Sequence, residues 1–341
     1  MKQLTVYLVL AVLFFSLGFL TNIYFKGDVG EITSVIPQIK EERSTDYSQY
    51  TIDNLKTNEY TPGKISQVET ITDNEDYLSS VFKFSFKPDP NLNNIKTISG
   101  QVNIPKAQDN LNKKYPLILM LRGYIDKDTF VTGDGTRRAG EVFAENGYIT
   151  VAPDFLGYGT SDSESGNIFE TRFQTYTTVL SLIKSLDQIA EWDKKNLFIW
   201  AHSNGGHVAL TILEITGAEI PTSLWAPVSK PFPYSVLYYT DQSVDNGKLI
   251  RTELNKFEKS NDPEKYSLTN YFDKINAPLQ IQQGDADDAV PITWSNTLVQ
   301  KLEDLDINVT YYTYNGTDHN MRPTWDLVVD RDLIFFKKYL K

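Results

Sequence analysis

The chain alternates hydrophobic and polar positions in its first part and forms continuous apolar runs further on. Apolar side chains recur at every second position in two short stretches, residues 80–86 and 97–104. This period of two is typical of strands that bury one face, and residues 88–91 between them, with two prolines, interrupt it as a turn does. The pattern predicts antiparallel strands at the start of a sheet, within residues 65–104.

Beyond residue 104 the pattern changes to strands that alternate with helices. Residues 115–121 are a continuous apolar run, which is the composition of a strand covered on both faces. Strands are predicted at 115–121, 148–153, 197–201, 222–226, 279–283 and 309–314, and helices at 136–146, 175–191 and 206–215. Such alternation predicts an α/β fold with a mostly parallel sheet and helices on both faces.

One segment, residues 228–276, interrupts the alternation between two predicted strands. It is rich in aromatic and charged residues and contains a predicted helix at 248–259. It lies on the side where the turn after residue 201 opens. Two interpretations fit this segment equally: a small helical lid or cap over a site, or an excursion that packs on the rim of the sheet.

The N-terminus begins with Lys2 and an apolar run over residues 4–25, which is about long enough to cross a bilayer as one helix. We predict a membrane anchor over residues 1–26, with the N-terminus in the cytoplasm and the folded domain outside it. Lys26, on the far flank, weakens the charge bias behind this orientation. The alternative is a signal peptide, cleaved near Ser16 or Gly18 to give a secreted protein.

Residues 27–61 are polar and keep neither a helical nor a strand period for long. A linker with little packing of its own is therefore expected there, followed by a folded domain over residues 62–341. A chain of 341 residues accommodates one α/β domain of this size with a tail.

The composition excludes several classes of function. The net charge of −11 disfavours nucleic acids and anionic membrane surfaces as partners. The chain has no cysteine, which excludes disulfides, thiolate metal sites and a cysteine nucleophile. Composition leaves the oligomeric state open.

Residues 196–206 run an apolar stretch straight into a tight turn with Ser203 at its tip. A strand that reverses sharply into a helix strains the residue at the tip, so small residues are needed two positions before and two positions after it. Ala201 and Gly205 occupy those positions. Ser203 is therefore the candidate nucleophile.

A serine hydroxyl needs an imidazole to take its proton, and the chain offers three histidines. His202 lies inside the turn beside the serine, and His207 lies on the predicted helix behind it. Both are interpreted as structural. His319 lies in a polar loop directly after the predicted strand 309–314, and a loop at a strand end is where the base of such a site belongs. His319 is the candidate base.

The carboxylate that orients the imidazole is sought in residues 283–291, which follow another predicted strand. Three aspartates compete there: Asp285, Asp287 and Asp288. Asp287 is preferred because the chain can turn at Gly284 before presenting it. Local reasoning leaves the other two open.

An oxyanion hole needs two donors aimed at the charge that develops on the carbonyl oxygen. The backbone N–H of Asn204, directly after the serine, is the first candidate. The second is the backbone N–H of Tyr124, beside Gly123 in the loop after the strand 115–121.

With these residues, the chain resembles the α/β-hydrolase superfamily, in particular the catalytic domain of prolyl oligopeptidase-type (family S9) serine hydrolases. The similarity covers roughly residues 78–341, and its motifs are Ala201-His202-Ser203-Asn204-Gly205-Gly206, Gly284-Asp285-Ala286-Asp287-Asp288-Ala289-Val290-Pro291, Asp318-His319 and residues 152–162. The order serine, aspartate, histidine matches that superfamily. The resemblance implies the α/β-hydrolase fold and assigns the acid to Asp287.

The chain departs from the family pattern at three places. Ala201 replaces the usual glycine, and Arg122 stands where many relatives carry histidine. The residues before Leu78 are too few for the propeller domain that restricts many S9 peptidases to short peptides. The resemblance therefore leaves the choice between peptidase and esterase open.

The leading hypothesis is a serine hydrolase that cleaves an ester or amide bond of a small ester or short peptide through an acyl-enzyme, without metal or cofactor. A carboxylesterase or acyl hydrolase is the alternative, and a non-catalytic binding module on a hydrolase fold is a third hypothesis. Four aromatic residues are expected either to line an apolar pocket or to belong to the core: Trp225, Phe232, Tyr234 and Tyr238.

Overall fold

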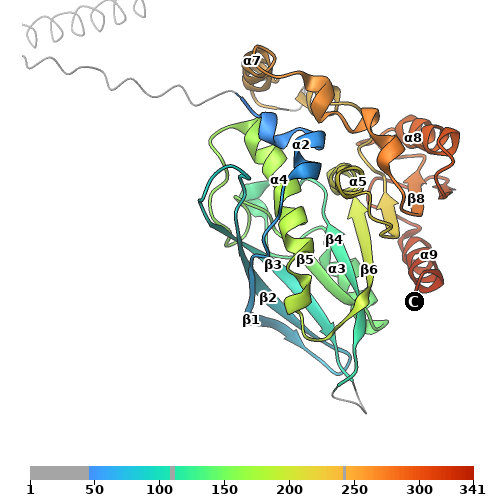
Figure 1. Cartoon of the computed structure of the whole chain (residues 1–341). Helices are drawn as coiled ribbons and strands as arrows, with labels where there is room; N and C mark the ends of the chain where they lie inside the picture. Colours follow the sequence, from blue (N-terminus) through green and yellow to red (C-terminus); the bar gives the residue numbers. More distant parts are fainter. Residues whose placement is uncertain (1–45, 108–111, 241–242) are drawn as a thin grey trace, which may run out of the picture. The chain divides into compact units, whose positions relative to one another are not determined.

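The computed structural model describes residues 46–107, 112–240 and 243–341, and this part of the chain contains one nine-stranded sheet (Figure 1). Its strands are β1 Lys64–Asp73, β2 Tyr77–Phe86, β3 Lys96–Pro105, β4 Tyr115–Leu121, β5 Ile149–Pro153, β6 Trp192–His202, β7 Thr222–Trp225, β8 Leu279–Gly284 and β9 Val309–Tyr314. Their spatial order is β1-β2-β3-β5-β4-β6-β7-β8-β9.

The sheet has an antiparallel part and a parallel part. β1, β2 and β3 pair antiparallel with their neighbours, and β3 also pairs antiparallel with β5. From β5 to β9 every pairing is parallel. The predicted α/β fold with a mostly parallel sheet is confirmed, including the antiparallel strands at its start.

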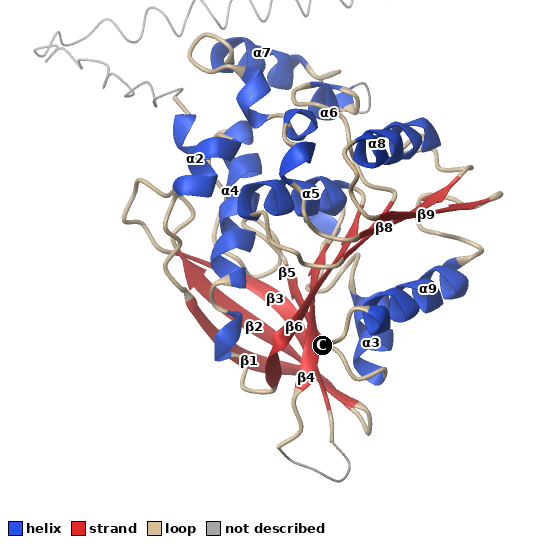
Figure 2. Ribbon diagram, turned by 45° about the vertical axis from the view of Figure 1, so that its right-hand side comes forward, coloured by secondary structure: helices blue, strands red, loops and turns tan. Residues whose placement is uncertain are grey.

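Helices cover both faces of the sheet (Figure 2). They are α2 Ile52–Thr57, α3 Arg137–Glu145, α4 Ile168–Ile183, α5 Asn204–Thr216, α6 Tyr234–Leu237, α7 Lys248–Phe257, α8 Ile292–Asp304 and α9 Trp325–Lys338. α3 and α9 lie on one face, whereas α4, α5 and α8 lie on the other (Figure 2). This two-sided cover explains the apolar run of β4: Leu117 and Leu119 pack into one hydrophobic cluster, and Ile118 and Met120 into the other.

The helix predicted at 175–191 is displaced, because α4 begins at Ile168 and ends at Ile183. The Asn167 side chain accepts hydrogen bonds from the backbone N–H groups of Phe169 and Glu170, which satisfies two donors at the helix start. Past residue 183 the chain forms only a short 3₁₀ turn, Leu186–Gln188. The prediction from hydrophobic periodicity did not take the asparagine cap into account.

The prediction of an unpacked linker is wrong for its last part, residues 46–61. Tyr47, Tyr50 and Leu55 are buried there, and the Tyr47 ring stacks on Phe257 of α7 at 5.8 Å between centroids. The surface that buries this segment comes from residues more than 100 positions later. Local sequence patterns contain no information about such distant contacts. The folded part thus begins well before residue 62.

The predicted membrane anchor, residues 1–26, lies outside the described residues, as does the linker up to residue 45. Within 46–107, 112–240 and 243–341, no helix has the length and apolar content needed to span a bilayer.

Replacing Leu55 by alanine tests whether residues 46–57 belong to the folded domain. Leu55 has no exposed surface. Its truncation removes buried apolar contacts, so we expect Leu55→Ala to lower the free energy of unfolding by about 2–4 kcal/mol, measured with urea. Lys56→Ala, at an exposed position of the same helix, is the control and should change it by no more than about 0.5 kcal/mol. Equal effects of the two substitutions would show that α2 does not stabilise the domain.

Candidate active site

Ser203 occupies a strained turn between β6 and α5. Its backbone has φ 55° and ψ −119°, a conformation that side chains other than glycine rarely adopt. Hydrogen bonds fix this turn: the Ser203 N–H donates to Trp225 O at 2.9 Å, and the Ser203 carbonyl accepts from Val228 N–H at 3.0 Å. The side chain is therefore presented where the parallel strands end.

The glycines after the serine are required by close approach of the backbone. A Cβ at Gly205 would lie 2.0 Å from the Leu121 carbonyl oxygen, and one at Gly206 would lie 2.6 Å from Pro227 Cβ. Both distances are shorter than real contacts. The small-residue spacing around Ser203 thus reflects packing of α5 against the ends of β4 and β7.

His319 and Asp287 lie together. His319 Nδ1 is 2.8 Å from Asp287 Oδ2, and the aspartate side chain has no exposed surface whereas 16% of the His319 side chain is exposed. The other carboxylate oxygen of Asp287 accepts the backbone N–H groups of Ala289 at 2.9 Å and Val290 at 2.8 Å. Gln283 Nε2 donates to Oδ2 at 3.0 Å. The carboxylate is held rigidly and points at the imidazole.

The environment of Asp287 favours its ionised form. Burial acts to raise the pKa of the Asp287 carboxyl, but the hydrogen bond and charge of His319, with the N–H groups of Val290 and Ala289, outweigh burial and lower the pKa below its usual value. Asp287 is therefore negative at neutral pH. A negative carboxylate fixes the imidazole tautomer with its proton on Nδ1 and leaves Nε2 to accept one.

The other two aspartates of this loop do not contact the histidine. Asp285 Oδ1 accepts the Gly316 N–H at 2.6 Å and ties the two loops together, and Asp288 is exposed. Of the three candidates that the sequence left open, only Asp287 bonds His319 in the described structure.

His202 links His319 to the serine turn. His202 Nε2 is 2.9 Å from the His319 carbonyl oxygen, and the two rings lie 4.6 Å apart. Burial, followed by the neighbouring His319, lowers the pKa of His202 to about 4, so its ring is neutral and its Nε2–H donates to that carbonyl. Because His202 immediately precedes Ser203, this bond holds the His319 loop beside the serine.

His207 is buried in α5, and its Nδ1 lies 3.2 Å from the Val228 carbonyl oxygen. Burial, and after it the charge of Arg172, lowers the pKa of His207 well below its usual value. It packs in the interior away from the His319 and Asp287 pair, in agreement with its interpretation as structural.

The loop after β4 approaches the serine closely. A Cβ at Gly123 would lie 3.0 Å from Ser203 Cβ and 3.5 Å from Ser203 Oγ, so the Gly123 backbone is next to the hydroxyl. The following residue, Tyr124, has 75% of its surface exposed and lines the cavity beside this loop. Asn204 is the first residue of α5, where N–H groups of a helix are free to bind an anion.

The Arg122 side chain holds the loop after β4 in place. The sequence alone does not reveal this role. Its guanidinium donates to the Gly123 carbonyl at 2.9 Å and to the Asp154 carbonyl at 2.7 Å. The same group lies 3.9 Å from the Tyr158 ring centroid and 4.7 Å from that of Phe130. The arginine therefore ties the backbone that carries Tyr124 to the Asp154 backbone.

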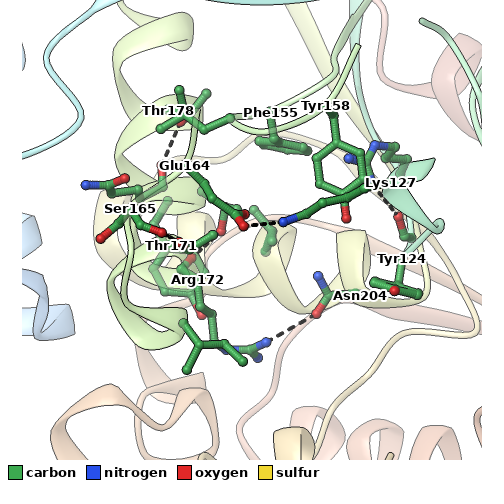
Figure 3. Close-up of a pocket in the computed structure, with 18 of the residues that line it drawn as sticks. Tyr124, Lys127, Phe155, Tyr158, Glu164, Ser165, Thr171, Arg172, Thr178 and Asn204 are labelled. Atoms are coloured by element: carbon green, nitrogen blue, oxygen red, sulfur yellow. Dashed lines mark hydrogen bonds and ion pairs between the residues drawn. The ribbon is translucent and has the colours of Figure 1, made fainter. Parts of the chain in front are cut away.

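A cavity of about 640 Å³ adjoins the serine turn, and Gly123, Tyr124 and Asn204 form part of its wall (Figure 3). Lys127 and Glu164 form an ion pair at this wall, and Leu249 of α7 also lines the cavity. The segment 228–276 thus contributes to the cavity as well as packing on the rim. This volume is within the range of small-molecule sites.

The four aromatic residues expected to form a pocket or core divide between two environments. Trp225 and Phe232 are buried in the core, whereas Tyr234 and Tyr238 are 47% and 39% exposed. None of them lines the cavity beside Gly123. Phe232 belongs to the core, whereas Trp225, although buried, also lines a separate cavity with His202 and Trp325.

The chain is similar to known proteins in sequence and in fold. Residues 136–341 match the model of the prolyl oligopeptidase family. A relative in Bacillus subtilis (strain 168), named "Uncharacterized peptidase YtmA", is 26% identical over 231 residues, which are 66% of this chain and 84% of the relative.

Two solved structures illustrate the likeness of fold. A puromycin-hydrolyzing peptidase of Mycobacterium tuberculosis is 16% identical with a TM-score of 0.55, and the match covers 82% of this chain but only 39% of that protein. Acetyl xylan esterase 1 from Thermoanaerobacterium sp. JW/SL YS485 is 15% identical with a TM-score of 0.62, and the match covers 86% of this chain and 94% of the esterase. The family match extends over more than half of the chain, so the chain belongs to the prolyl oligopeptidase family and is a serine hydrolase.

Proposed function

We propose that Ser203, His319 and Asp287 form a catalytic triad that cleaves an ester or amide bond through an acyl-enzyme. The observation that carries this proposal is the 2.8 Å bond between His319 Nδ1 and the buried Asp287 carboxylate. It leaves His319 Nε2 as the proton acceptor, in a loop that His202 holds beside the serine.

The reaction has two steps. Ser203 Oγ attacks the carbonyl carbon and passes its proton to His319 Nε2, and the tetrahedral intermediate collapses when that proton goes to the leaving alcohol or amine. Water then attacks the acyl-enzyme and gives one proton to His319, and the carboxylic acid product leaves as Ser203 Oγ takes that proton from His319. Asp287 stabilises the imidazolium that forms in both steps.

The backbone N–H groups of Tyr124 and Asn204 are proposed to bind the oxyanion. Gly123 permits this arrangement because any side chain there would press on Ser203. Arg122 supports the loop by holding the Gly123 carbonyl, which fixes the plane of the peptide that carries the Tyr124 N–H. Donors fixed before the reaction stabilise the developing charge without a reorganisation cost.

Two substrate classes are supported by the relatives' names. The Bacillus subtilis relative is named a peptidase, so cleavage of short peptides is the first candidate. A carboxylesterase is the second, because the chain matches nearly the whole of an acetyl xylan esterase but only part of the puromycin-hydrolyzing peptidase. Both classes use the same acyl-enzyme and differ in the leaving group.

Replacing Ser203 tests the nucleophile. We expect Ser203→Ala to lower kcat by about 10⁴-fold or more on p-nitrophenyl esters or aminoacyl-proline amides, because no other hydroxyl replaces its Oγ. A fluorophosphonate probe should label the wild-type serine and leave the variant unlabelled. Ser163→Ala, at an exposed serine, is the control for the substitution itself. Undiminished turnover by Ser203→Ala would remove Ser203 from this role, and absence of labelling in the wild type would favour a binding module without catalysis.

Replacing Asp287 tests the acid. We expect Asp287→Asn to lower kcat by about 10³- to 10⁴-fold, because an amide favours the wrong imidazole tautomer. The depressed pKa of Asp287 also stabilises the folded protein above about pH 4, the ordinary aspartate range, and this contribution is lost as the pH falls through the folded-state value.

The stability of the same variant can be followed by urea unfolding. At pH 7 the Asp287→Asn protein should be less stable by about 1–3 kcal/mol, and the difference should shrink at pH 3. Asp288→Asn, at the exposed neighbouring position, is the matched control. A difference that stays constant between pH 7 and pH 3 would show that the charge of Asp287 does not stabilise the fold.

We also propose that residues 1–26 anchor the chain in a membrane, with the catalytic domain outside the cytoplasm. The apolar run over residues 4–25 after Lys2 supports this proposal. The full chain should remain with membranes after carbonate extraction and dissolve in detergent, whereas a chain that begins at Gly27 should be found in the soluble fraction. An N-terminus starting near residues 16–18 in the released protein would instead support signal cleavage and secretion.

A further inference from the structure

Arg172 lines the cavity beside the serine turn, and part of its guanidinium group has no hydrogen-bond partner among the described residues. This residue lies in the first turns of α4, and its side chain points toward Asn204, directly after the nucleophile (Figure 3). Arg172 Nη1 donates to Asn204 Oδ1 at 3.5 Å, which is a long contact with a neutral amide. Its Nε and Nη2 atoms are buried and have no hydrogen-bond partner within the described residues.

The carboxylates near the cavity bond groups other than Arg172, and Asp126, which lines it, accepts the Asp128 N–H. Glu164 pairs with Lys127, and Glu170 accepts the Ser165 hydroxyl. Glu253 pairs with Lys256 and also accepts from Asn167. No ion pair of Arg172 with a carboxylate is found in the part of the chain that the structure describes.

The groups buried beside Arg172 do not supply a counter-charge either. Burial, and after it Arg172 itself, lowers the pKa of His207, which keeps that imidazole neutral. The Tyr176 phenol is within hydrogen-bonding reach of Arg172, but burial raises the pKa of Tyr176, so the phenol stays neutral and supplies no negative charge.

A half-buried guanidinium with two buried nitrogen atoms and no negative partner is unfavourable. Removing a charge from water is unfavourable unless an opposite charge and hydrogen bonds compensate. The planar guanidinium presents parallel N–H donors that match a carboxylate, which can bind two of them at once. The free donors of Arg172 therefore have the chemistry of an incomplete carboxylate site at the edge of the proposed reaction centre.

We propose that Arg172 binds a carboxylate carried by the substrate, so that the enzyme prefers esters or amides with a carboxylate a few bonds from the scissile carbonyl. Asn204 relates the two sites, because its backbone N–H is the proposed oxyanion donor and its side chain contacts Arg172. When the substrate carbonyl lies at Ser203, the negatively charged substituent of the substrate extends into the cavity of about 640 Å³. This inference rests on the proposed role of Ser203.

The test compares substrates that differ only in this charge. On the acyl side, p-nitrophenyl hemiglutarate is paired with p-nitrophenyl valerate. On the leaving-group side, the acetate ester of 4-hydroxyphenylacetic acid is paired with that of its primary amide. For each pair the measured quantity is the ratio of kcat/KM for the charged substrate to kcat/KM for the neutral one, and the pair with the larger ratio identifies the side on which the carboxylate binds.

We expect the wild-type enzyme to prefer the charged member of one pair, and Arg172→Gln to lower that ratio about 10- to 100-fold, mainly through KM. Arg172→Lys should retain part of the preference, because an ammonium keeps the charge but loses the planar pair of donors. Lys127→Gln is the matched control: it removes a cation from the same wall, but one already paired with Glu164, and should leave the ratio as in the wild type.

Three results would overturn the inference. A wild-type enzyme without preference for the charged member of either pair contradicts it directly and needs no variant. Arg172→Gln and Arg172→Lys that slow both members of a pair equally would show a structural role through Asn204. An equal fall of the ratio in Lys127→Gln would show general attraction of anions. Fluorophosphonate labelling of each Arg172 variant separates these results from failure of the Ser203 proposal, which would abolish labelling in the wild type as well.

Discussion

The close approach of three backbone segments at the serine turn is the constraint on which the rest of the site depends. Gly205 at the start of α5 leaves no room for a side chain against the Leu121 carbonyl at the end of β4. The same turn donates from Ser203 N–H to Trp225 O at the end of β7. Because these contacts are made by the backbone, the position of the serine is set by strand packing and not by side chains that can rotate. The strained φ of Ser203 is sustained by this surrounding structure.

A second close approach joins the loops that carry the acid and the base. A Cβ at Gly284 would lie 2.0 Å from the Thr317 carbonyl oxygen, and the Ala286 N–H donates to that same oxygen at 3.1 Å. The loops after β8 and β9 are therefore packed against each other by contacts other than the bond between His319 and Asp287. The electrostatics agree with the geometry, because the aspartate is negative and the adjacent His202 is neutral.

The sequence predicts most of the sheet because burial on both faces gives the central strands β4, β5 and β6 apolar runs, and the more polar strands β7, β8 and β9 continue the same alternation. It predicts the serine, histidine and aspartate because each follows one of these strands. It fails where a single polar contact or a distant surface decides the outcome. Asn167 starts α4 earlier than the periodicity indicates, and Tyr47 packs on Phe257, which is far away in the sequence.

The two arginines of the site illustrate the same limit. Arg122 and Arg172 are ordinary charged residues in the sequence. Only the fold shows that Arg122 holds the loop after β4, and that Arg172 lines the cavity while two of its buried donor atoms lack a partner among the described residues. The role of a long side chain depends on groups that lie tens of residues away. Periodicity and motif spacing contain no information on those distances.

β4 lies between β5 and β6 in the sheet but outside the residues that match the family. The match to the family begins at residue 136, after β4, yet β4 pairs with both β5 and β6 and its last residues form the floor under the serine turn. A fragment cut to the limits of the sequence similarity would lack the strand between β5 and β6 and the loop that carries Gly123. The region of family similarity is therefore shorter than the folded unit. A fragment that keeps the sheet continuous has to include β4, which precedes residue 136.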